Sequence, residues 1–152
     1  MKQIARVLWP FALVIAFGVI STTPAAGQTS TGIRAGLSVD PDQFYFGGHL
    51  ETPPLVDRLR FKPNAEIGVG KDVTVVALNL EFAYGFPSQR GWNAYAGAGP
   101  ALIISDRDSN TNSGGGFNML LGLSHRSGLF TEIKIGVVDS PELKIGVGYS
   151  FR

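Results

Sequence analysis

Along most of the chain, apolar and polar residues alternate one by one rather than with a helical period. The clearest stretch is the last one, where apolar side chains stand at Leu143, Ile145, Val147, Tyr149 and Phe151, with lysine, glycine or serine at each position between. A period of two places successive side chains on opposite faces of a β-strand. The chain is therefore predicted to end on a strand with one apolar face and one small or polar face.

Seven earlier segments alternate in the same way, and turn-forming residues separate them. The predicted strands span residues 33–39, 43–51, 58–69, 73–84, 92–104, 117–125, 129–138 and the chain after residue 142. Short connections make neighbouring strands pair antiparallel, and eight such strands can close into a barrel that has no exposed edge. The predicted fold is all-β: an eight-stranded, antiparallel, up-and-down barrel.

Three features interrupt this pattern. Pro63 and Pro100 fall inside predicted strands, and since proline cannot donate to a strand ladder, each is predicted to mark either a bulge or a strand boundary that lies a few residues away. Residues 105–116, "SDRDSNTNSGGG", form the longest polar stretch and are predicted to be a flexible, solvated loop.

The polar face of these strands indicates which way the barrel faces. It is rich in glycine, which suits the cramped interior of a narrow barrel better than a surface in water. Its charges are of both signs and could neutralise one another inside the lumen, as buried charges must. The predicted lumenal network comprises Arg34, Glu51, Arg58, Arg60, Lys62, Glu66, Glu81, Glu132, Lys134 and Lys144. The apolar face is then predicted to contact lipid.

Large aromatic residues on the apolar face gather near the strand ends. Phe44 and Phe117 are predicted at one end of the barrel, and Tyr84, Trp92, Tyr149 and Phe151 at the other. Membrane barrels carry such aromatic girdles at both interfaces. The alternative is a soluble periplasmic barrel of the lipocalin type, with its apolar face turned inward around an apolar ligand.

The beginning of the chain has the layout of a secretory signal peptide. Lys2 and Arg6 precede an apolar run at 7–20 and small residues around Ala25 and Gly27. We therefore expect a signal peptide at 1–27 and a barrel domain at 28–152.

The composition of the chain speaks against two other classes of protein. The absence of cysteine excludes a disulfide framework, and the net charge of +1 gives no argument for a nucleic-acid partner. Charged residues make up 16% of the chain, against about 25% in typical soluble domains.

The last strand resembles the C-terminal assembly signal of Gram-negative outer-membrane barrels at Lys144, Gly146, Tyr149 and Phe151, although the chain continues to Arg152. The strand count and interior composition are similar to those of the small OmpA-transmembrane-domain and OmpX-like barrels. The resemblance implies a monomer in the outer membrane, exported via the periplasm, with outer-membrane lipids, lipopolysaccharide and the barrel-assembly machinery as partners and no cofactor. It also implies periplasmic termini, which would place the connections at 40–42, 70–72, 105–116 and 139–142 outside the cell.

Candidate chemistry is sparse. Residues 106–112 place Asp or Asn at every second position, but the glycine and glutamate of an EF-hand are missing. His125 and Ser127 with Glu132 suggest a lipid-modifying hydrolase. In the topology that the resemblance implies, however, the His125–Ser127 pair falls in a periplasmic turn, and Ser127 suits turn chemistry. His49 is predicted to face the lumen.

An acidic rim bridging lipopolysaccharide through divalent cations is a hypothesis that involves Asp40, Asp42, Asp106, Asp108, Asp139 and Glu142. No catalytic or metal site is assigned. The predicted function is a structural, surface-interaction or porin-like membrane barrel without enzymatic activity.

Overall fold

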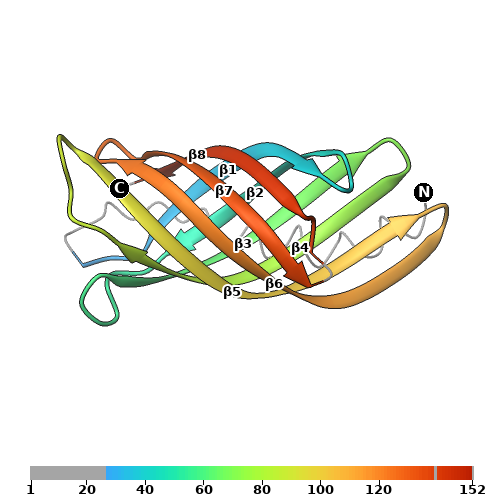
Figure 1. Cartoon of the computed structure of the whole chain (residues 1–152), viewed down its shortest axis with the longest axis horizontal. Helices are drawn as coiled ribbons and strands as arrows, with labels where there is room; N and C mark the ends of the chain where they lie inside the picture. The colour runs from blue at the N-terminus through green and yellow to red at the C-terminus, as the bar shows by residue number, and fades with distance from the viewer. Residues whose placement is uncertain (1–26, 139, 152) are drawn as a thin grey trace.

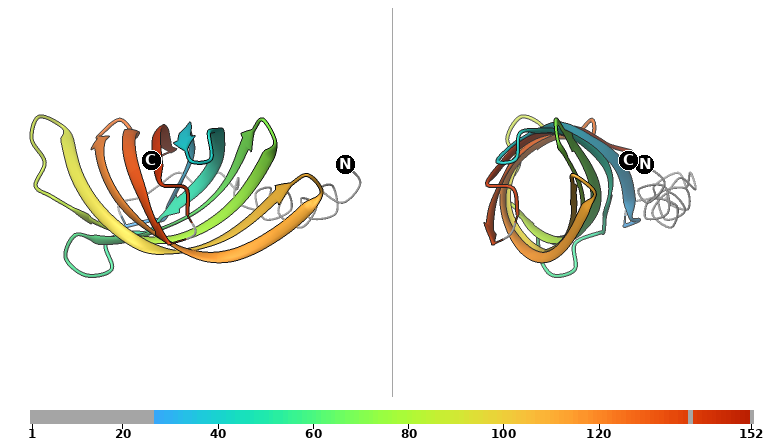
Figure 2. Two further views of the ribbon diagram at one scale, coloured as in Figure 1. Left: turned by 45° about the vertical axis from the view of Figure 1, so that its right-hand side comes forward. Right: turned by 90° about the vertical axis from the view of Figure 1, so that its right-hand side faces the viewer.

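The computed structural model describes residues 27–138 and 140–151, so the predicted signal peptide lies outside the described residues except for Gly27. Eight strands form one sheet: β1 (Ser30–Val39), β2 (Gln43–Glu51), β3 (Leu59–Gly70), β4 (Val73–Gly85), β5 (Trp92–Arg107), β6 (Asn110–His125), β7 (Leu129–Val138) and β8 (Leu143–Phe151). Each strand pairs antiparallel with the next, and β8 pairs with β1, which closes the barrel (Figures 1 and 2). The predicted fold class is confirmed. No helix in the described part of the chain is long and apolar enough to cross a bilayer.

The up-and-down order gives the barrel two ends with different connections. At one, called here the terminal end, β1 begins, β8 ends, and residues 52–58, 86–91 and 126–128 join the strands. At the other, the distal end, β1 joins β2, β3 joins β4, β5 joins β6, and β7 joins β8. Figure 1 shows the distal end on the right.

The prediction of a solvated loop at 105–116 is wrong. β5 and β6 each run for 16 residues and are joined by Asp108 and Ser109 alone. Both residues have positive φ, 50° and 68°, as a two-residue hairpin turn of type I′ requires. The polar residues 110–116 belong to β6 because each of them pairs with a residue of β5. Residues 110–116 extend beyond β7 and form the hairpin that reaches furthest at the distal end (Figure 1).

Pro63 and Pro100 mark neither a bulge nor a strand boundary, so this prediction is also wrong. Pro63 pairs with Leu80 in an unbroken β3–β4 register, while β3 pairs with β2 only from Asn64 onward. Pairing of β4 with β5 lapses opposite Pro100 and resumes in the same register. Each proline thus lies where one neighbouring ladder ends or lapses, so its missing N–H removes no bond. The register of the sheet does shift at another place, between Phe117 and Asn118 in the pairing of β6 with β7.

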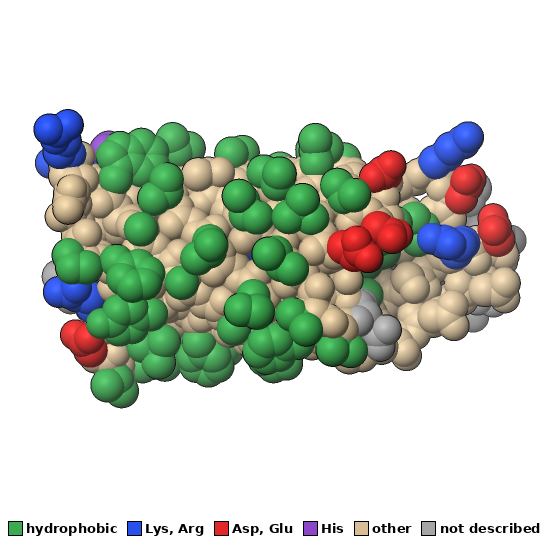
Figure 3. All heavy atoms as spheres, viewed as in Figure 1, with side chains coloured by type: hydrophobic (Ala, Val, Ile, Leu, Met, Phe, Trp, Pro, Cys, Tyr) green, Lys and Arg blue, Asp and Glu red, His purple; other side chains and the backbone are tan. Residues whose placement is uncertain are grey.

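The two faces of the sheet have opposite chemistry. Leu121, Ile133, Ile145 and Leu37 pair in sequence across four strands, and all four side chains are exposed on the outside. Figure 3 shows hydrophobic side chains over the barrel's side and charged ones gathered toward its two ends. Inside, Lys134 is only 2% exposed. This arrangement contradicts the apolar interior that the lipocalin-type alternative requires.

Candidate functional site: the charged lumen and its vestibule

The middle of the lumen holds a cluster of buried ions centred on Glu66 of β3. Its carboxylate accepts hydrogen bonds from Arg34 Nη1 at 3.2 Å, Lys134 Nζ at 3.0 Å and Lys144 Nζ at 2.7 Å. The four side chains come from four strands and are all buried. A buried carboxylate with three cationic partners is fully compensated, so the cluster ties together strands that are not all neighbours.

A second carboxylate, Glu132 of β7, extends this cluster toward the terminal end. It accepts from Arg34 Nη1 at 3.1 Å and from Tyr95 Oη at 2.7 Å, and it lies 3.8 Å from Lys62 Nζ. Glu81 of β4 completes the cluster with an ion pair to Lys134 at 2.8 Å. We call this set the central ion network: Arg34, Lys62, Glu66, Glu81, Glu132, Lys134 and Lys144.

A row of amides runs beside the central ion network. Asn118 donates to Asn79 at 2.8 Å, Asn79 donates to Asn64 at 2.7 Å, and Asn64 donates to Glu81 at 2.7 Å. Our sequence reasoning did not select these residues, although each stands at an inward position of an alternating strand. The alternation of apolar and polar residues in each strand was the signal that could have identified these asparagines as lumenal.

Aromatic rings fill the remaining width of the lumen, and each one lies against glycine on another strand. A Cβ added at those glycines would have no room beside the ring. The pairs are Tyr45 on Gly36 and Gly146, Tyr95 on Gly122, and Phe130 on Gly148. The inward position of Phe130 was not predicted from the sequence, although the neighbouring residues of β7 alternate regularly. The glycines of the polar face therefore provide space for side chains that cross the barrel.

Two predicted members of the lumenal network lie apart from its centre. Arg60 Nη1 pairs with Glu51 at 2.9 Å near the terminal end, and the Arg60 side chain is 42% exposed. Arg58 lies before β3 in the connection, is exposed, and makes no ion pair with another described residue. Arg58 was predicted as a strand residue of the lumenal charge network, but β3 begins one residue later than predicted, and Arg58 instead lines the mouth of the lumen.

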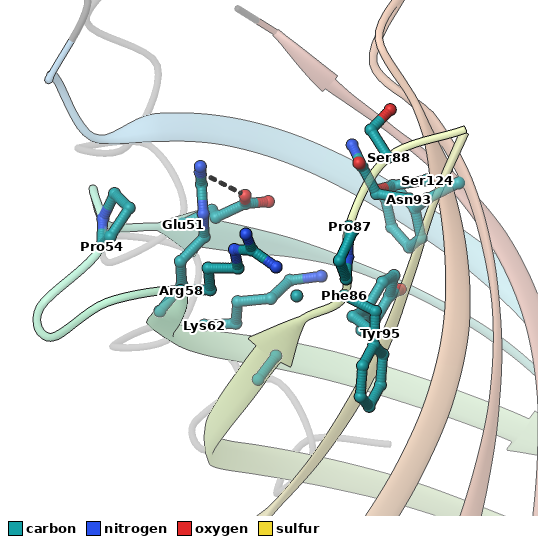
Figure 4. A pocket seen from close by; sticks show the side chains of 14 residues that line it. Glu51, Pro54, Arg58, Lys62, Phe86, Pro87, Ser88, Asn93, Tyr95 and Ser124 are labelled. Carbon is teal, nitrogen blue, oxygen red and sulfur yellow. Dashed lines mark hydrogen bonds and ion pairs between the residues drawn. The ribbon is translucent and has the colours of Figure 1, made fainter. Parts of the chain in front are cut away.

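At the terminal end the lumen opens into a cavity of about 340 Å³, called here the vestibule. Arg58 and Lys62 lie on one side of it, and Phe86, Asn93 and Tyr95 lie on the other (Figure 4). Arg60 also lines this cavity. The distal part of the lumen is different, since it contains an apolar cluster of Val75, Ala77, Ala101 and Ile103. The lumen therefore changes from charged and open at one end to apolar at the other.

The aromatic residues predicted as girdles point outward, and all six are exposed. Phe44 lies one residue inside the distal start of β2, and Phe117 pairs with Val138 at the distal end of β7. The other four lie near the terminal ends of their strands: Tyr84, Trp92, Tyr149 and Phe151.

The four residues that match the assembly signal divide between the two faces of β8. Lys144 and Gly146 face the lumen, where Lys144 binds Glu66 and Gly146 lies beside Tyr45. Tyr149 and Phe151 face outward, with ring centroids 5.4 Å apart.

The three candidate hydrolase residues do not form one site, because only two of them meet. His125 Nδ1 lies 2.9 Å from Ser127 Oγ in the exposed connection at the terminal end, but Glu132 is buried in the central ion network. His49 hydrogen-bonds Ser150 at 2.9 Å inside the lumen. Among the described residues, no group of three His, Cys, Asp or Glu side chains could hold a metal ion. Of the acidic rim, Asp139 lies outside the described residues.

Comparisons with family models and with curated proteins find no match for the chain. Among solved structures, it is similar to the N-terminal β-barrel domain of OprF from Pseudomonas aeruginosa, with a TM-score of 0.60 and 20% identity over 82% of this chain and 99% of that one. It is also similar to Neisserial surface protein A, with a TM-score of 0.60 and 15% identity over 81% and 96% of the two chains. A designed transmembrane β-barrel matches with a TM-score of 0.55 and 13% identity over 86% and 100%. The chain therefore has the fold of small eight-stranded outer-membrane barrels.

Proposed function

We propose that this protein is an integral outer-membrane β-barrel with a structural or surface-interaction role and no catalytic activity. The observation that carries the proposal is the reversed distribution of its side chains, with apolar residues outside and a paired ion network inside. In water, such an apolar outer face would be an aggregation hazard. In a bilayer the same face contacts the acyl chains of the lipids. Closure of the barrel also pairs the backbone hydrogen-bonding groups of every strand within the membrane.

The dimensions of the strands support this proposal. The shortest strands have nine residues, and a tilted strand of about 9–11 residues spans a bilayer. Outward aromatic residues near both ends of the barrel match the two interfaces of a membrane. Lipids and lipopolysaccharide are then the partners of the outer face, and the protein acts as a monomer, since closure leaves its strands paired.

We place the terminal end in the periplasm and the distal end at the cell surface. This orientation follows from export through a signal peptide at 1–27 and from recognition of β8 by the assembly machinery. The β5–β6 hairpin would then be the part of the protein most available to partners outside the cell.

The lumen supports a closed rather than a porin-like barrel. Glu66 and Lys134 are 1% and 2% exposed, so water-sized solutes do not reach the middle of the lumen. We therefore expect reconstituted protein to show no stable conductance in planar bilayers. Steps of the size that general porins give would contradict the closed lumen.

Cysteine labelling tests insertion and orientation together. A membrane-impermeant maleimide should label Ser109→Cys in intact cells, whereas Ser88→Cys at the terminal end should react only after the outer membrane is opened. The wild-type chain has no cysteine and serves as the blank. Equal labelling of both variants after osmotic shock, with the protein released in soluble form, would contradict the proposal.

A further inference from the structure

The vestibule at the terminal end has an excess of positive charge. Three of its lining residues are cationic, Arg58, Arg60 and Lys62, and one is anionic, Glu51. Arg60 is paired with Glu51, whereas the Arg58 guanidinium makes no ion pair with a described residue. The cavity thus presents cationic groups that its own carboxylate does not balance.

Lys62 supplies hydrogen-bond donors at the floor of this cavity. Its side chain is buried, and its ammonium lies 4.4 Å from the ring centre of Tyr95 and 5.0 Å from that of Phe130. A carboxylate oxygen of Glu132 lies 3.8 Å from this ammonium, which donates no hydrogen bond to another described residue. An ammonium has three donors, and because Lys62 lines the cavity, its donors are available to a ligand there.

The vestibule is closed on its inner side. Beyond Lys62 lie the other members of the central ion network, of which Glu66, Glu81 and Lys134 are almost fully buried. A solute that enters from the terminal end therefore stops above Lys62. A blind cavity can hold a ligand, but it does not conduct one through the barrel.

We propose that the vestibule binds a small organic anion through a carboxylate or phosphate group. The anionic group would lie between Lys62 and Arg58, whose side chains project into the same hollow in Figure 4. Phe86 and Tyr95 offer apolar surface on the opposite wall, and Asn93 offers a polar group for orientation. The volume of about 340 Å³ is at the lower end of ordinary ligand sites, which restricts the ligand to a small molecule. In the proposed orientation of the barrel, the ligand would arrive from the periplasm.

Three probes that share a phenyl ring test this site in the refolded full-length barrel in detergent micelles. Benzoate carries a carboxylate, phenyl phosphate carries a phosphate, and benzamide is neutral. We expect saturable shifts of the backbone amide signals of Asn93 and Tyr95 with at least one of the two anions and none with benzamide. The stronger anion identifies the preferred head group.

Matched charge-neutralising variants separate specific binding from general attraction. Arg58→Gln should weaken binding of the preferred anion about tenfold, as expected for loss of one charged hydrogen bond. Arg126→Gln removes the same charge from an exposed position at the same end and should leave affinity unchanged. Binding of benzamide as strong as that of the anions, equal weakening by both variants, or no saturable shift with either anion would overturn the proposal. The test does not depend on the protein's location, because it is made in micelles.

Discussion

Arg34 and Glu66 lie two strands apart and form a 3.2 Å ion pair across the strand between them. In the register of the sheet, Arg34 is paired with Gly47 and Gly47 is paired with Glu66. A residue without a side chain therefore lies at the level where the arginine reaches across β2. The glycine content of the inner face and the charges of the lumen are parts of one arrangement, because large ions can meet only where small residues leave space.

Gly47 gives the most direct test of this relationship. A Cβ at Gly47 would clash with the backbone oxygen of Ala65 and lie 2.9 Å from Cα of Glu66. Gly47→Ala should therefore lower the free energy of unfolding by about 1–3 kcal/mol, the usual cost of overpacking. Urea unfolding in lipid vesicles, followed by the fluorescence of Trp92, measures this change. Gly48→Ala is the matched control, since its nearest contact would be an ordinary 3.6 Å. Equal effects at both positions would contradict the role of space at Gly47.

Neutralising Glu66 should destabilise the barrel far more than neutralising an exposed carboxylate. Glu66→Gln keeps the shape but leaves Arg34, Lys134 and Lys144 without their shared carboxylate, and breaking a buried pair costs about 3–5 kcal/mol. Adding Lys144→Met should restore part of the loss because it removes one unpaired ammonium. Glu142→Gln, at an exposed position, should change the stability by less than about 0.5 kcal/mol. A loss for Glu66→Gln no larger than this control would show that the network is not energetically coupled.

The outward face of β7 allows a depth test of the membrane assignment. Ile133 lies near the middle of β7 and Leu129 at its terminal start, and both are exposed on the same face. Ile133→Arg should destabilise the barrel in a bilayer by about 2–4 kcal/mol, whereas Leu129→Arg should cost about 0–1 kcal/mol. Folding into vesicles at several urea concentrations gives both values. Equal losses of folding free energy for the two substitutions would contradict a lipid-facing belt around the barrel.

The last strand should matter more during assembly than for the finished fold. We expect Phe151→Ala to reduce the amount of heat-modifiable, folded barrel in the outer membrane, because the terminal aromatic is part of the proposed recognition signal. Phe46→Ala removes an aromatic ring that is exposed to a similar extent on β2 and should reduce it less. If the two variants assemble equally well in cells, β8 does not act as the proposed signal.

Much of the fold could be predicted from the chain because barrel strands carry a recognisable local pattern, the alternation of apolar and polar residues. This pattern placed β7 correctly at both ends and identified the inward charges of the central ion network. It failed at residues 105–116, where polarity indicated a loop, because strand pairing depends on a partner rather than on hydrophobicity. It also failed at Pro63 and Pro100, whose effect depends on which side their missing donor faces.

The site was harder to predict than the fold. Alternation shows that Asn64 and Phe130 face inward, but only the tilt and closure of the barrel decide which side chains meet across the lumen. Arg58 and Arg60 illustrate the limit, since the alternation places both inward, whereas the start of β3 leaves one in a connection and the other at the mouth. The vestibule arises from the ends of several strands and has no signature in any one of them.

The two-residue turn at Asp108 and Ser109 makes the tip of the β5–β6 hairpin a tolerant insertion point. Neither residue belongs to a strand, and the ladder on both sides begins with the pair Arg107 and Asn110. Lengthening a flexible loop adds only about 0.6 kcal/mol of closure entropy for each doubling of its length. A foreign peptide spliced between Asp108 and Ser109 would therefore leave the barrel intact, and with the distal end outside the cell, it would be presented as an accessible epitope.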